Sequence, residues 1–69
     1  MDPYQILANA IIIQAAKDYR VALRRLKRNP NNREARAAAA EIERFFRSGY
    51  YRTMTNVDGE MLIKKLKEG

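Results

Sequence analysis

The chain has 69 residues with a formal net charge of +6, and it contains no Cys, His or Trp. A chain of this length forms one domain at most, so we expect residues 1–69 to be a single helical domain. Without His or Cys it lacks an imidazole base, a thiol nucleophile, the usual zinc ligands and disulfides. Because the eight acidic residues are also scattered, we expect no enzyme, no metal site and no cofactor.

The small size of the chain predicts that something beyond its own core contributes stability. A domain this short buries only about 60% of the surface that its unfolded chain exposes. With disulfides and metals excluded, self-association or a partner is the remaining route. The apolar stretch at residues 11–13 is far shorter than the ~20 residues of a membrane span. We therefore expect a cytosolic, unprocessed protein that has no membrane partner.

The first helix is predicted over residues 2–28. Asp2 suits the N-cap, Pro3 suits the first helical position, and Gln5 is placed to close a capping box. Pro30 disfavours helical geometry at Asn29 and ends the helix there.

The second helix is predicted over residues 32–47, with Asn31 or Asn32 as its cap. One apolar stripe follows this helix, and Gly49 is expected to end it in the left-handed conformation. The stripe consists of Ala35, Ala38, Ile42, Phe45 and Phe46.

The third helix is predicted over residues 56–67, with Thr55 as the cap and Asp58, three residues later, as another candidate cap. For residues 50–54 the sequence allows either a single helical turn or a loop. Gly59 in an early turn of this helix lowers helix propensity, which suggests that another part of the chain approaches closely there. The predicted fold class is therefore all-α, a three-helix domain with a long first helix.

Two apolar lines follow the first helix. One has 4/3 spacing and is expected to face the core, and the other lies on a neighbouring face. Two short helices cover one line, so the uncovered remainder predicts a self-association face, most simply in a two-fold dimer. The alternative is that both helices straddle the first and the protein is a monomer. The core line is Ile12, Ala16, Tyr19, Leu23 and Leu26, and the candidate self-association residues are Ile6, Leu7, Ile11, Ile12 and Ile13.

Positive charge concentrates in residues 17–36, which carry eight basic and two acidic side chains and hence the whole net charge of +6. A few cations at a helix C-terminus merely offset the helix dipole, but eight exceed that role. They indicate a surface for a polyanion or an acidic partner, and the alternative is a basic face that is merely solvated. Arg is the commoner cation here, and guanidinium groups suit bidentate contacts with phosphate or carboxylate.

Aromatic and Arg side chains alternate in residues 43–52, a composition that suits a base or nucleotide. The alternative is that Phe45 and Phe46 fill the core and Glu43 pairs with Arg47. Together the two segments predict these polyanion-binding residues: Lys17, Arg20, Arg24, Arg28, Arg44, Arg47 and Arg52.

Three segments form a recognisable pattern along the chain: Lys17-Asp18-Tyr19-Arg20, Glu43-Arg44-Phe45-Phe46-Arg47-Ser48, and Asp58-Gly59-Glu60 followed by Leu62-Ile63. In this pattern the chain resembles a family of small proteins found in phages and prophages of Gram-positive bacteria. It implies a phage-associated accessory protein in the host cell cytoplasm, and small proteins of that origin often inhibit host defence.

The function expected from these observations is non-enzymatic binding. An Arg-rich surface engages a phosphate-bearing ligand (a nucleotide or nucleic acid) or an acidic host defence protein, in a protein that is a homo-oligomer. The alternatives are a small DNA- or RNA-binding regulator and a structural or assembly protein.

Overall fold

The computed structural model describes residues 2–69, and in this range the chain forms helices and no strand. The all-α expectation is confirmed. The expected number of helices is too low. Residues 50–54, for which a helical turn or a loop was expected, belong to a short helix of their own. The helices are α1 (Pro3–Arg28), α2 (Arg33–Phe46), α3 (Gly49–Met54) and α4 (Gly59–Glu68).

Helix α1 begins and ends at the predicted residues. The Asp2 carboxylate accepts a hydrogen bond from the Tyr4 amide at 3.0 Å, and the Asn29 amide donates to the Arg25 carbonyl at 2.9 Å. Gln5 closes no capping box. Its side-chain amide donates to the Asn9 side chain at 2.9 Å and to the Met54 carbonyl at 3.2 Å, which ties the start of α1 to the end of α3.

Helix α2 is capped by Asn32, whose side-chain oxygen accepts from the Ala35 amide at 3.0 Å. The expectation that Gly49 adopts the left-handed conformation is wrong, since no glycine among residues 2–69 has positive φ. Ser48 explains the difference, because its hydroxyl accepts from the Tyr51 amide at 3.1 Å and starts α3 at once.

Helix α4 begins at Gly59, a few residues later than predicted, because Asp58 is its cap. The Asp58 carboxylate accepts from the Glu60 amide at 3.0 Å. Thr55 instead follows the end of α3, and its hydroxyl accepts from the Val57 amide at 3.2 Å.

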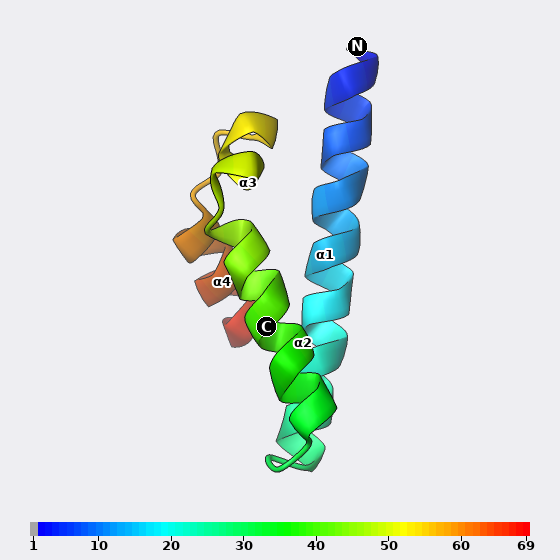
Figure 1. The fold of residues 1–69 in the computed structure, drawn as a ribbon, viewed down its shortest axis with the longest axis vertical. Coiled ribbons are helices and arrows are strands. Elements are labelled where there is room, and N and C mark those ends of the chain that lie inside the picture. The colour runs from blue at the N-terminus through cyan, green and yellow to red at the C-terminus, as the bar shows by residue number, and fades with distance from the viewer. Residues whose placement is uncertain (1) are drawn as a thin grey trace.

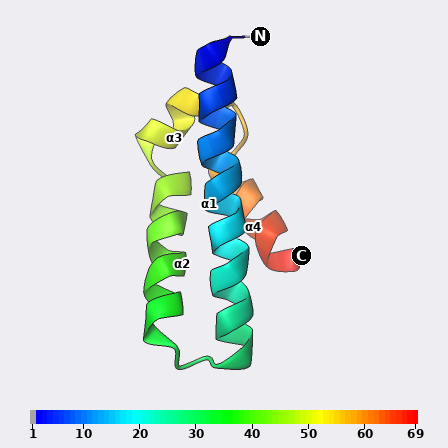
Figure 2. The same ribbon diagram turned by 90° about the vertical axis from the view of Figure 1, so that its right-hand side faces the viewer.

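The long rod of α1 organises the molecule, which measures 41 × 19 × 17 Å. Helix α2 runs back along the second half of α1, and α3 turns across the upper part of the molecule (Figure 1). Helices α2 and α4 flank α1 on different sides (Figure 2). The first half of α1 therefore has fewer neighbours than the second half.

The core lies where α1, α2 and α4 meet. Its largest fully buried side chains are Tyr19, Phe46 and Tyr51. The rings of Tyr19 and Phe46 meet edge to face with centroids 6.2 Å apart, and those of Phe46 and Tyr51 with centroids 5.7 Å apart. The predicted core line of the first helix is confirmed, since Tyr19 is buried and the other members pack against the core: Ile12, Ala16, Leu23 and Leu26.

Gly59 packs closely against the end of α2. A Cβ atom at this position would lie 1.9 Å from the Phe46 carbonyl oxygen. The close approach predicted from the sequence is thus confirmed. Only a hydrogen atom fits between the first turn of α4 and the end of α2, so this contact sets how near α4 comes to the core.

Replacing Gly59 by Ala is expected to lower the free energy of unfolding by about 1–3 kcal/mol, because backbone must shift to admit the methyl group. Urea unfolding followed by circular dichroism measures this change. The matched control is Gly49→Ala, where a Cβ meets nothing within 4 Å. That variant is expected to gain about 0.4–1 kcal/mol. Equal effects of the two substitutions would contradict the close-packing account.

Candidate functional site

Four of the predicted binding cations share one side of the second half of α1. Lys17, Arg20, Arg24 and Arg28 follow one another at three- and four-residue spacing, and all four are exposed. At about 1.5 Å rise per residue they form a strip roughly 17 Å long. We call these four residues the basic ridge.

A groove runs between the basic ridge and the last turn of α4. It has a volume of about 580 Å³ and contains cations from both helices: Arg20, Arg24, Lys27 and Lys67. Leu23 and Leu66 provide its apolar lining, and Leu66 is buried against the core. The packing of α4 on α1 therefore brings cations far apart in the sequence to one place, which we call the basic groove.

Almost none of the positive charge here is neutralised within the chain. Among residues 2–69 the ion pairs within 4.0 Å involve only two cations, Arg47 and Lys65. Glu68 lies in the basic groove, but its carboxylate is nearest Lys65, at 3.9 Å. The ridge and groove therefore present exposed cations that are not paired with acidic side chains of the described residues.

Two cations of the basic groove, Lys27 and Lys67, are outside the set of predicted binding residues. Helical spacing from Arg24 fits either Lys27 or Arg28 as the last cation of the strip, and only Arg28 was predicted. Lys67 had no comparable signal, because only the packing of α4 places it beside α1.

The other predicted cations lie away from the ridge. Arg47 and Arg52 line a different hollow of about 530 Å³ around the α3–α4 connection, together with the acidic residues Asp58 and Glu60. Arg44 is exposed on α2. The structure thus separates the seven predicted binding residues into the four of the ridge and three elsewhere.

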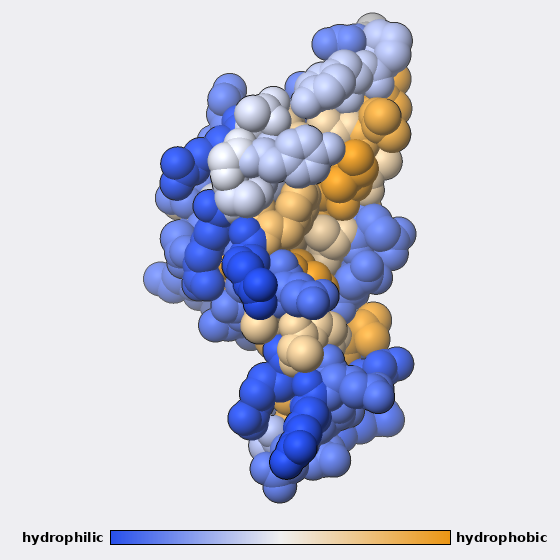
Figure 3. Space-filling view, viewed as in Figure 1, coloured by the Kyte–Doolittle hydropathy of each residue, from blue (hydrophilic) through white to orange (hydrophobic). Residues whose placement is uncertain are grey.

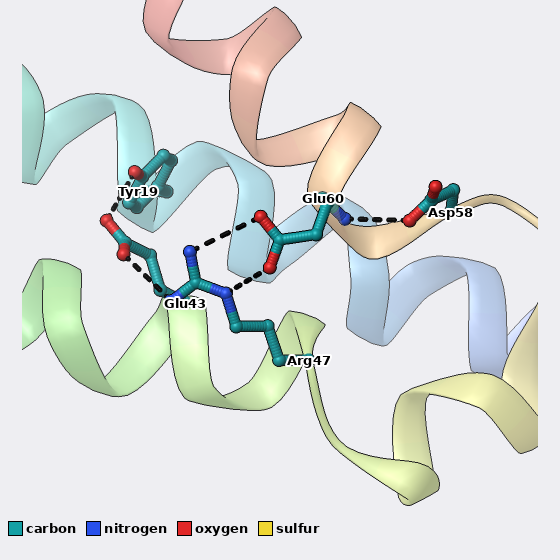
Figure 4. A network of polar contacts seen from close by, with 5 residues as sticks. All are labelled: Tyr19, Glu43, Arg47, Asp58 and Glu60. Atoms are coloured by element: carbon teal, nitrogen blue, oxygen red, sulfur yellow. Dashed lines mark hydrogen bonds and ion pairs between the residues drawn. The ribbon is translucent and has the colours of Figure 1, made fainter.

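Arg47 belongs to a network that links three helices (Figure 4). The Tyr19 hydroxyl donates to the Glu43 carboxylate at 2.7 Å, and the other Glu43 oxygen is 3.3 Å from an Arg47 nitrogen. The Arg47 guanidinium also donates to both oxygens of Glu60, with one separation of 3.4 Å. The predicted Glu43–Arg47 pair is confirmed. The Arg47 guanidinium also joins the end of α2 to α4 through its contacts with Glu60.

The network shifts the ionisation of its members. Burial, followed by the hydrogen bond to Glu43, raises the pKa of the Tyr19 hydroxyl. The hydrogen bond from Arg47 lowers the pKa of Glu60, and the same bond raises the pKa of Arg47. Each shift keeps the network in the protonation state that holds it together near neutral pH.

Replacing Tyr19 by Phe is expected to lower the free energy of unfolding by about 1–2 kcal/mol, because Glu43 loses a donor in a partly buried position. Chemical denaturation measures the loss. Tyr50→Phe serves as the control, since Tyr50 is 61% exposed. Similar losses in both variants would mean that the Tyr19 hydroxyl contributes nothing specific.

Replacing Glu60 by Gln is expected to destabilise the protein in a pH-dependent way. The pKa of Glu60 is lowered in the folded state from an ordinary value of 4.5, so the carboxylate stabilises the fold above that pH. The wild type's advantage over Glu60→Gln should be full at neutral pH and disappear as the pH falls through the lowered pKa. Urea midpoints across acid pH measure this. Glu41→Gln is the control, and an advantage that persists in strong acid would argue against the Arg47–Glu60 pair.

The predicted self-association residues divide between two environments. Ile6, Leu7, Ile11 and Ile13 are exposed, but Ile12 is half-buried and packs against the core. Ile12 therefore contributes to the fold, because α4 and α3 cover that side of α1. The other four remain on open surface.

Among residues 2–69, no three Asp, Glu, His or Cys side chains gather in a way that could hold a metal ion. Within the same range, no helix is both long enough and apolar enough to cross a membrane.

Comparison of the chain with protein-family models, with curated proteins and with solved structures found no match.

Proposed function

We propose that the chain is a non-enzymatic binding protein whose basic ridge and basic groove engage a phosphate-bearing polyanion. The observation that carries the proposal is the gathering of exposed cations without ion-pair partners along one side of α1 and across to Lys67 on α4. Charge of one sign along a surface attracts polyanions and releases their counterions on binding.

The shape of the ridge favours an extended ligand. Its strip of about 17 Å spans several phosphates of a nucleic-acid backbone, since duplex DNA carries a charge every ~1.7 Å of its axis. The three Arg side chains of the ridge suit bidentate contacts with phosphate oxygens. The favoured ligand is therefore the phosphodiester backbone of a nucleic acid.

The surroundings of the ridge indicate little reading of sequence. Asn29 and Asn31 lie exposed in the α1–α2 connection, and the Asn32 side chain is occupied as a helix cap. Aromatic side chains for stacking on bases are also missing from the lining of the basic groove. Phosphate contacts position a protein without reading bases, so the binding should tolerate many sequences.

The sequence resemblance to small phage and prophage proteins supports a role for this protein inside a phage-infected host cell. In that setting the protein is an accessory factor that covers nucleic acid or withholds it from a host defence protein. A regulator of DNA or RNA would use the same surface.

A single nucleotide is the second candidate ligand. The basic groove favours it, because a volume of about 580 Å³ lies within the size range of small-molecule sites and combines an apolar lining with cations. This ligand would raise the melting temperature saturably, by mass action on the folded state.

The double substitution of Arg20 and Arg24 by Gln is expected to weaken binding to a labelled DNA duplex by about tenfold or more at low salt. The wild type should show a slope of about −4 to −5 in log K against log salt, and the variant a slope shallower by about 2. Fluorescence anisotropy over a salt series measures both.

The matched control replaces Arg44 and Arg52 by Gln, which removes the same charge elsewhere on the surface. This control should bind almost as the wild type does. Equal weakening by both pairs would show that only net charge matters. Absence of duplex binding, together with a saturable thermal shift by a nucleotide, would select the second candidate.

A further inference from the structure

The chain exposes more surface than a compact monomer of its mass. Its accessible area is 5401 Å² at 8.0 kDa, whereas a compact monomer of this mass exposes about 4,450 Å². The radius of gyration is 12.7 Å, against about 11 Å for a compact chain of this length. The excess of about 950 Å² is close to the ~800 Å² that each partner buries in a dimer of standard size.

The large hydrophobic side chains that remain exposed are concentrated on α1. Of the nine large hydrophobic side chains exposed within residues 2–69, six belong to α1: Tyr4, Ile6, Leu7, Ile11, Ile13 and Val21. Figure 3 shows hydrophobic colours along the first half of α1 and in the hollow beside it, whereas the opposite end of the molecule is hydrophilic. An unpartnered apolar surface of this kind marks an interaction site.

The two flanks of α1 differ in what they offer a partner. On the α2 side, a groove of about 390 Å³ is lined mainly by apolar side chains, with Ile11 and Ala15 facing Ile42 and Phe45. On the α4 side, Ile13 borders a smaller hollow of about 180 Å³. The α2 side therefore has the larger apolar groove.

The pattern of residues along this flank is self-complementary. Tyr4, Leu7 and Ile11 follow at three- and four-residue spacing, which is the spacing of a helix–helix seam, and Leu7 is 62% exposed. The groove's acidic residues, Asp18 and Glu41, lie at the end away from Tyr4. One end of the stripe thus holds a hydroxyl donor and the other end holds carboxylate acceptors.

We infer that a second copy of this chain covers the flank, in an antiparallel two-fold dimer centred near Ile11. A two-fold axis there places Tyr4 beside the partner subunit's Asp18, a hydroxyl donor beside a carboxylate. It also places Leu7 against the partner subunit's Ala15. A parallel arrangement would instead bring the acidic ends of the two grooves together, which like charges oppose.

The dimer leaves the basic ridge open. With 3.6 residues per turn, Arg20 and Arg24 lie about 100–180° round α1 from Leu7 and Ile11. Each dimer therefore presents two basic ridges. The inference does not rest on the proposed function, although two ridges on one particle would strengthen attachment to an extended polyanion.

The oligomeric mass of matched variants tests the inference. Light scattering coupled to size-exclusion chromatography should give the wild type twice the monomer mass of 8.0 kDa. Leu7→Glu should give the monomer mass, because the substitution places a charge in the proposed interface. Its helicity should be unchanged, because Leu7 is 62% exposed and does not belong to the core. Ile13→Glu, which adds the same charge at a 54% exposed position on the other flank, should remain a dimer.

Crosslinking tests the position of the axis. The chain has no Cys, so Ile11→Cys carries a single thiol, and a short bis-maleimide should join two copies efficiently. Ile13→Cys should crosslink poorly. A monomeric wild type overturns the inference, as does a dimer that survives Leu7→Glu, is broken by Ile13→Glu, or crosslinks better through residue 13 than through residue 11.

Discussion

The burial of one tyrosine organises this protein. Tyr19 is fully buried where α1, α2 and α4 meet, and its ring packs edge to face on Phe46. A buried hydroxyl needs a partner, and the Glu43 carboxylate supplies it. Glu43 in turn contacts Arg47, whose guanidinium reaches Glu60 on α4. The apolar core and the polar network that links the three helices therefore depend on the same side chain.

The basic groove exists because of where α4 packs. Gly59 lets α4 approach the end of α2, and the last turn of α4 then lies beside the second half of α1. This placement brings Lys67 to the cations of α1. The basic groove thus depends on a glycine contact in the first turn of α4, at the other end of that helix.

Helix α1 carries different chemistry along its length. Its first half exposes apolar side chains, and its second half exposes the basic ridge. Helices α2 and α4 pack mainly beside the second half of the rod, so the first half keeps an open apolar flank. The basic ridge lies on a side of the second half that these helices leave exposed. The proposed dimer and the proposed polyanion site therefore use different parts of one helix.

Local sequence was sufficient for the helices and for the core line, because caps, proline and apolar spacing act within a few residues. Asp2, Asn29 and the Tyr19 line were all predicted from such signals. The extra helix α3 was not, since Ser48 is a cap that competes with a glycine stop signal, and packing of Tyr51 in the core favours the helix. The contact of Arg47 with Glu60 and the place of Lys67 were decided only by tertiary structure. Both depend on contacts between segments distant in the sequence, which no local spacing encodes.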